Sequence, residues 1–257
     1  MAPSQEEWDA LTESERAEVV AALPGEVTDA EMSPPEGDRH FKAKVRALGA
    51  LRSFFTRQRR RIHLSAQLPV YYPGAARFAP DLLAVLDVED IDRDKWLVSA
   101  EGKGLDWVLE VHVGGDRKKD AEDNVSRYAS LGIPEYFVYD RARNRLAAFR
   151  LPAPDARTYT PIVPQHGISE SQVLGLDVQI EKDRLRFYSG TALLLESDEL
   201  IARLEHMVDE VQQRAEQVQQ RAEEEARLRV DEVKRRESAE RELVELREEL
   251  ARLKALR

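Results

Sequence analysis

The sequence predicts a mixed α/β domain that is followed by a long α-helical coiled coil. In several short segments between residues 62 and 190, apolar residues alternate with polar ones or form short runs, which is typical of strands. The segments 39–61 and 117–131 instead have apolar residues at helical spacing. Residues 198–257 contain neither proline nor glycine. We therefore expect a mixed sheet flanked by helices, followed by one uninterrupted helix.

Charge divides the chain into blocks that its net charge of -10 conceals. Residues 1–36 hold ten acidic residues and one basic residue, whereas residues 39–63 hold nine basic residues and no acidic one. We expect an acidic region of helices and linker over 1–36, an α/β domain over 37–197 and a coiled coil over 198–257. The first region begins with Ser4 and Thr12, each followed three residues later by Glu, which predicts two capped short helices.

The basic block predicts a helix over 39–61. Its apolar stripe is Phe41, Val45, Leu48, Leu51 and Phe55, and most of its basic residues lie off that stripe. Such a block can bind the phosphates of a nucleic acid. It can equally be a solvated helix face that the acidic N-terminal region balances. The candidate nucleic-acid-binding residues are Lys42, Lys44, Arg46, Arg59, Arg60 and Arg61.

The remaining elements follow from shorter patterns. The segments 136–140 and 146–151 flank a turn rich in Arg and Asn and are expected to pair as a hairpin. Helix 117–131 ends at Gly132-Ile133-Pro134. The other expected strands are 62–68, 81–86, 107–113, 178–180 and 185–188.

The last sixty residues fit one heptad register at both ends, while the middle third has polar residues at the seam. This pattern predicts a coiled coil with a weak centre that joins two copies of the chain. The alternative is a single charged helix supported by ion pairs along its length. The a positions are Ile201, Val208, Ala215, Ala222, Arg229, Arg236, Leu243 and Leu250, and the d positions are Leu204, Val211, Val218, Glu225, Glu232, Ala239, Leu246 and Leu253.

Composition excludes several classes of protein. The absence of cysteine excludes a disulfide scaffold, thiol catalysis and cysteine-ligated zinc. No apolar run approaches the length of about 18 residues that a membrane helix needs. The polar, acidic start, Met1 to Trp8, does not resemble a secretory signal. We therefore expect a cytoplasmic protein with no membrane partner.

Asp81, Glu110 and His112 are the candidate site. Asp81 opens one predicted strand, and Glu110 lies inside another that is otherwise apolar, where a carboxylate is costly to bury unless it is paired or binds a metal. His112 shares the face of Glu110. Two carboxylates on neighbouring strands with a nearby cation suit metal-assisted hydrolysis of phosphodiesters. The competing interpretation is a set of exposed acids or structural ion pairs.

These residues also carry a family resemblance. Pro80-Asp81, Glu110-Val111-His112, the helix that contains Tyr128 and the segment 132–140 resemble the Uma-type restriction endonucleases of the PD-(D/E)XK nuclease superfamily. The motif Met32-Ser33-Pro34-Pro35 adds to this likeness, which spans roughly residues 25–190. The resemblance implies a restriction-endonuclease-like core and Mg²⁺- or Mn²⁺-dependent hydrolysis of DNA. Asp81 and Glu110 correspond to its metal-binding acids.

The lysine of the family is missing from its usual positions. His112 stands where the superfamily motif has lysine, and Asn124 stands where the Uma-type pattern has it. On a helix over 117–131, Lys118 lies about 60° from the apolar face, so we expect Lys118 to supply the charge. The predicted catalytic residues are thus Asp81, Glu110, Lys118 and His112. The alternative is a degenerate nuclease fold that serves as a coiled-coil assembly or DNA-binding scaffold.

Overall fold

The computed structural model describes residues 2–26, 37–113 and 118–255, without the side chains of 118–122, 249–251 and 253–255. The Met32–Pro35 motif therefore lies outside the described residues. The chain divides into two compact units, one that ends at Ser197 and one that begins at Asp198, and each is described by itself.

A six-stranded sheet forms the centre of the first unit. Its strand order is β1-β3-β5-β6-β7-β8, in which β5 and β6 are parallel and all other neighbours are antiparallel. Helix α5 (Lys118–Ser130) connects the parallel pair. The strands are β1 (Ile62–Ser65), β3 (Leu82–Leu86), β5 (Trp107–His112), β6 (Glu135–Asp140), β7 (Arg145–Arg150) and β8 (Thr160–Pro161). The mixed sheet and the β6–β7 hairpin are those that the sequence predicts.

Two smaller sheets accompany the central one. An antiparallel sheet has the order β12-β11-β10-β9, and β2 pairs with β4 in parallel. The four-stranded sheet contains β9 (Ser169–Ser171), β10 (Leu176–Glu181), β11 (Arg184–Ser189) and β12 (Ala192–Leu193), and the pair consists of β2 (Val70–Tyr71) and β4 (Trp96–Leu97).

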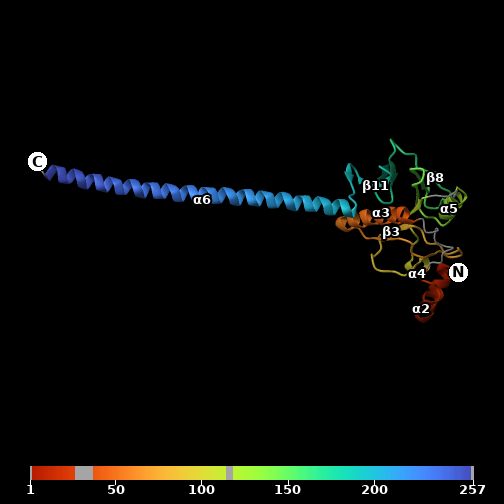
Figure 1. Cartoon of the computed structure of the whole chain (residues 1–257). Coiled ribbons are helices and arrows are strands. Elements are labelled where there is room, and N and C mark those ends of the chain that lie inside the picture. The colour runs from red at the N-terminus through yellow and green to blue at the C-terminus, as the bar shows by residue number, and fades with distance from the viewer. Residues whose placement is uncertain (1, 27–36, 114–117, 256–257) are drawn as a thin grey trace. The chain divides into compact units, whose positions relative to one another are not determined.

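The two faces of the central sheet bury separate cores. Leu82, Leu109 and Phe137 face helix α3 (Gly37–Gln58) and the four-stranded sheet. Leu83 and Val108 face α5 and the β2–β4 pair. Every residue of β5 from Trp107 to Val111 is buried, because both faces of this strand are covered. Helix α3 contacts β1, β5 and β11, and Figure 1 shows it near β11.

The first turns of helix α3 bury a different face from the predicted one, whereas Leu51 and Phe55 of the predicted stripe are buried. Phe41 is 61% exposed and Val45 is 49% exposed, whereas His40 and Lys44 are buried. In these first turns the buried positions lie one residue, or about 100°, before the predicted ones. Alanines at 43, 47 and 50 face the sheet and allow a close approach, while the two polar residues find a partner at the end of the sheet.

The acidic N-terminal helices are anchored by a third, small core. Helices α1 (Gln5–Ala10) and α2 (Glu13–Ala22) begin with the predicted capping boxes at Ser4 and Thr12. Trp8 of α1 is buried with Tyr71 and Leu97, next to the short helix α4 (Val98–Glu101).

The second unit consists of helix α6 (Ser197–Ala255), which is unbroken (Figure 1). The long C-terminal helix is confirmed, and its pairing with a second copy stays a prediction. Its side chains from 201 to 248 are exposed in the single chain. No helix in the described part of the chain is long and apolar enough to cross a membrane.

Candidate active site

The antiparallel register of β3 and β5 brings the two predicted acids together. Leu82 pairs with Leu109, so the next position along places Asp81 opposite Glu110. The backbone N–H of Asp81 donates to Oε2 of Glu110 at 3.3 Å. Both side chains are buried, at 3% and 6% exposure. The acids at these two strand positions are therefore a buried cross-strand pair.

Helix α3 supplies two cationic or protonatable partners for Asp81. Nε2 of His40 lies 2.9 Å from Oδ2, and Nζ of Lys44 lies 3.3 Å from Oδ1. The backbone N–H of Val111 donates to Oδ2 at 2.9 Å. Burial raises the pKa of Asp81, but these bonds and the charges of His40 and Lys44 outweigh it, so the pKa lies below its ordinary value.

Glu110 has fewer compensating partners. Tyr128 of α5 donates from its hydroxyl to Oε1 of Glu110 at 2.6 Å. Burial, followed by the negative charge of Asp81, raises the pKa of Glu110 to about 8, although the bonds from Tyr128 and the Asp81 backbone oppose this rise. The two acids thus share a buried site, in which the partners of Asp81 favour its ionised form whereas burial favours the neutral form of Glu110.

Comparison with known proteins supports the resemblance that these residues carry. The family model Uma2, described as "Putative restriction endonuclease", matches residues 5–181. The chain belongs to the Uma2 family. Among solved structures, a "putative nuclease belonging to DUF820" from Anabaena variabilis is similar at 13% identity and a TM-score of 0.43, covering 55% of this chain and 76% of its own. No curated protein matches the chain.

Among the described side chains, Lys44 places a positive charge at the acids, and the role expected of Lys118 stays a prediction. Lys118 is the first residue of α5, and its side chain lies outside the described residues. Asn124 is half-buried beside the Tyr136 hydroxyl. The lysine that reaches Asp81 is Lys44, which the sequence placed on a solvent-facing, nucleic-acid-binding surface. That expectation is corrected because the side chain of Lys44 is 8% exposed and its charge is bound by a carboxylate.

The carboxylate pair suits a hard cation. In the described part of the chain, no three His, Cys, Asp or Glu side chains form a group that could hold a metal ion. Mg²⁺ does not require such a group, because it is commonly held by one or two carboxylates, with water and substrate phosphate as its other ligands. A cation at this position would favour the ionised form of Glu110, whose pKa is raised by burial and by the charge of Asp81. The donor set of Asp81 and Glu110 therefore fits Mg²⁺ or Mn²⁺.

The other predicted residues lie around or away from the pair. His112 is half-buried in β5, opposite Asp140 of β6, and its catalytic role stays a prediction. Lys42 is 56% exposed and bonded to Asp38. Arg46 lies 3.2 Å from the buried Glu196.

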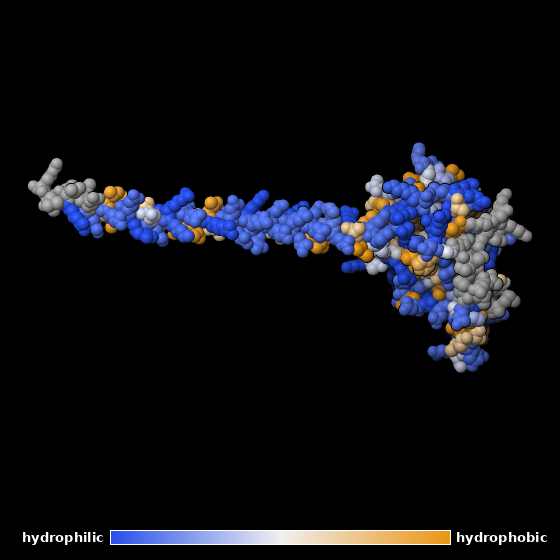
Figure 2. All heavy atoms as spheres, in the orientation of Figure 1, coloured by the Kyte–Doolittle hydropathy of each residue, from blue (hydrophilic) through white to orange (hydrophobic). Residues whose placement is uncertain are grey.

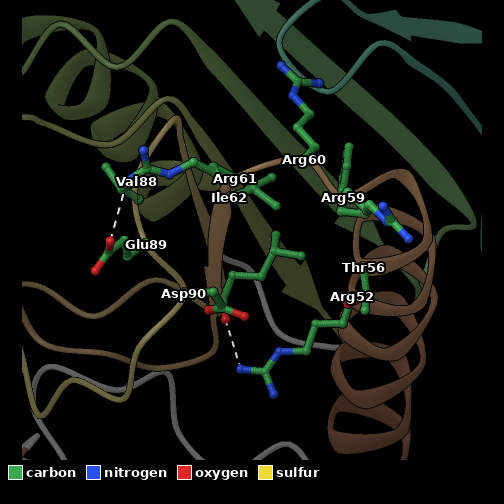
Figure 3. A pocket seen from close by; sticks show the side chains of 11 residues that line it. Arg52, Thr56, Arg59, Arg60, Arg61, Ile62, Val88, Glu89 and Asp90 are labelled. Carbon is green, nitrogen blue, oxygen red and sulfur yellow. Dashed lines mark hydrogen bonds and ion pairs between the residues drawn. The ribbon is translucent and has the colours of Figure 1, made fainter.

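Arg59, Arg60 and Arg61 gather at the far end of α3. Ile62, which follows them, pairs with Leu86, at the opposite end of β3 from the Asp81 end. Figure 3 shows the three arginines around a pocket of about 410 Å³ that Arg52 and Glu89 also line. The length of α3 between Lys44 and the arginines is about 20 Å. The structure therefore does not bring these arginines to the acids.

Sequence reasoning overlooked His40 and Tyr128 as partners of the acids. A signal for His40 was present, because His40, Lys44, Ala47, Leu51 and Phe55 also recur at three- and four-residue steps. The two stripes share Leu51 and Phe55, and the greater hydrophobicity of Phe41, Val45 and Leu48 favours the other one. No comparable signal marks Tyr128, whose spacing also fits a simple core residue.

Proposed function

We propose that this protein is a divalent-metal-dependent endonuclease that hydrolyses DNA phosphodiesters, with Asp81 and Glu110 as its metal ligands. One observation carries this proposal: a buried pair of carboxylates on neighbouring strands has a buried lysine 3.3 Å from one of them. Membership of the Uma2 family supports the same reaction class. A divalent ion held there would activate a water molecule and neutralise charge on the reacting phosphate.

The surrounding residues have distinct roles in this proposal. Lys44 adds positive charge beside Asp81, where it can stabilise the charge that develops on a phosphate oxygen. His40 and the N–H of Val111 hold Oδ2 of Asp81 and so orient its carboxylate. Tyr128 does the same for Oε1 of Glu110. These contacts leave His40 and Tyr128 as positioning residues.

Lys44 takes the place of Lys118 as the proposed catalytic cation. The resemblance described in the sequence analysis implies a lysine where Asn124 stands, on the helix that covers one face of the sheet. Lys44 approaches from α3, which packs on the other face. Because Asp81 lies at the end of its strand, a side chain from α3 can reach it.

We further propose that DNA binds along α3 and the arginines that follow it, and that α6 joins two chains. The exposed Lys42 and the partly exposed Arg46 flank Lys44 in sequence, and the exposed Arg59, Arg60 and Arg61 would contact phosphates further along the same duplex. A protein that makes several such phosphate contacts should lose affinity for DNA steeply as the salt concentration rises.

Cleavage of supercoiled plasmid in Mg²⁺ or Mn²⁺ tests the proposed reaction. We expect nicked or linear product with the wild-type protein, none with EDTA, and none with Asp81→Ala. Asp155→Ala is the matched control, because Asp155 is an exposed acid in a loop. Failure of a folded, metal-loaded wild type on every DNA form would favour the scaffold alternative, which the Asn124 substitution motivates.

A further inference from the structure

The seam of α6 has a charged centre between two apolar ends. Its central a and d positions are Glu225, Arg229, Glu232 and Arg236, all of which are exposed in the single chain. On either side, Val218 is 66% exposed and Leu243 is 53% exposed. Figure 2 shows separated apolar side chains along this largely hydrophilic helix. Exposed apolar residues repeated at heptad positions require a partner.

A parallel, in-register pair of these helices would oppose like charges. Each a residue would face its own copy, and so would each d residue. Arg229 would then face Arg229 of the second copy, and Glu232 would face Glu232. Glu225 and Arg236 would likewise each face their own copies. Four consecutive seam layers would carry like charges, which disfavours this orientation.

An antiparallel pair places a residues against d residues, and one register makes all four charged central layers complementary. When Arg229 faces Glu232 of the second copy, Arg236 faces Glu225 of that copy. If the second helix is shifted by one heptad in one direction, Arg236 faces the apolar Val218. If it is shifted by one heptad in the other direction, Arg229 faces the apolar Ala239. The same register also pairs Ala222 with Ala239, Val218 with Leu243 and Ala215 with Leu246.

Ion pairs within each helix extend the central network. Arg236 lies 2.8 Å from Glu232, and Arg229 lies 4.0 Å from Glu225, one turn away in both cases. In the antiparallel register each arginine would contact one glutamate of its own helix and one of the second copy. The e and g positions, which flank the seam, offer pairs of opposite charge in both orientations. The charges at the a and d positions therefore determine which orientation is favoured.

We propose that α6 forms an antiparallel homodimer in the register that pairs Arg229 with Glu232 of the second copy. This inference rests on the self-association proposed above and not on the nuclease reaction. It has a functional consequence. At 1.5 Å per residue, the first residues of the two α6 helices lie roughly 100 Å apart. The coil itself would therefore not hold the two N-terminal units side by side, as one paired double-strand break would require.

Disulfide cross-linking of the full chain tests the orientation of the two helices. Because the chain has no native cysteine, only the introduced cysteines can form a disulfide. In the proposed register Ala222 meets Ala239 of the second copy. A mixture of Ala222→Cys and Ala239→Cys proteins should therefore form a cross-linked dimer under mild oxidation, whereas each variant alone should not. Copies of residue 222 would lie about 25 Å apart, far beyond disulfide reach.

The matched control is a mixture of Gln220→Cys and Arg241→Cys. These residues lie at the same height along the proposed coil but on its outer side, so their mixture should remain uncross-linked. Rapid cross-linking of Ala222→Cys alone would overturn the antiparallel orientation. If light scattering shows a dimer but the Ala222→Cys and Ala239→Cys mixture does not cross-link, the register is overturned. If the wild type is a monomer, self-association is overturned. A nuclease-inactive protein that passes the cross-linking test would leave this inference standing.

Discussion

Nζ of Lys44 lies 3.3 Å from Oδ1 of Asp81, and only 8% and 3% of the two side chains are exposed. Burying a lysine is costly unless its charge is matched, so this contact explains how α3 can turn a basic residue toward the core. It also places a positive charge beside the carboxylate pair, although the Uma2 lysine position is occupied by Asn124.

The first prediction concerns stability. Lys44→Met keeps the length of the side chain and removes its charge, which leaves Asp81 buried with one fewer partner. We expect the free energy of unfolding to fall by about 3 kcal/mol, as is typical when a buried ion pair loses one member. Lys42→Met is the control, since the Lys42–Asp38 pair is exposed to solvent and should contribute little to the free energy of unfolding. If urea denaturation shows that Lys44→Met and Lys42→Met lower the free energy of unfolding equally, the buried ion pair is contradicted.

The second prediction is a pH dependence that arises from Glu110. Its pKa is about 8 in the folded protein, above the ordinary value of 4.5 that we take for the unfolded chain. The neutral form therefore stabilises the fold fully at low pH, and this contribution is lost as pH rises through 8. In EDTA, the free energy of unfolding of the wild type should fall from pH 5 to 8.5 relative to Glu110→Gln.

Mg²⁺ should reduce that loss, because it favours the ionised carboxylate. Denaturant titrations at several pH values, with Mg²⁺ or with EDTA, measure both effects. Identical pH profiles of the wild type and Glu110→Gln would show that Glu110 is not responsible.

The third prediction separates positioning from packing at Tyr128. Tyr128→Phe removes the hydroxyl that donates to Glu110, and we expect affinity for Mn²⁺ to fall by about 10- to 100-fold. Tyr159→Phe is a matched control, because its hydroxyl is buried and donates to the carbonyl of Ile133. Both changes should lower stability by about 1–3 kcal/mol. Calorimetric titration that finds equal Mn²⁺ affinity in both variants would exclude a role for Tyr128.

The fourth prediction concerns the charged seam of α6. Replacing Arg229 and Arg236 with Glu makes four central seam positions acidic, so R229E/R236E should dissociate at concentrations where the wild type is dimeric. Mixing it with E225R/E232R, in which the four positions are basic, should restore a mixed dimer. Sedimentation at low and high salt measures this, since screening weakens the repulsion. An unaffected R229E/R236E homodimer would place the interface elsewhere.

Much of the fold was predictable from local pattern. The capping boxes at Ser4 and Thr12, the apolar segment of β5 and the hairpin of β6 and β7 each have a strong local signal. The rotation of α3 was not predictable in this way. Phe41 and Val45 are more hydrophobic than His40 and Lys44, yet the polar pair is buried because Asp81 lies within reach.

The candidate site shows the same limit. Asp81 and Glu110 were identifiable because acids are unusual at buried strand positions and because of the family resemblance. Their partners come from α3 and α5, which are distant in sequence, and only the packing of both helices on the sheet selects Lys44 and Tyr128. Helical spacing around α5 alone had favoured Lys118, because it could not include a lysine from another helix.

The most direct test of the account is plasmid cleavage in Mg²⁺ by the wild type, Lys44→Met and Lys118→Met, each confirmed to be folded. We predict cleavage by the wild type, a loss of about 100-fold or more with Lys44→Met, and near wild-type cleavage with Lys118→Met. An inactive wild type would contradict the nuclease itself, and a loss confined to Lys118→Met would contradict the role of Lys44.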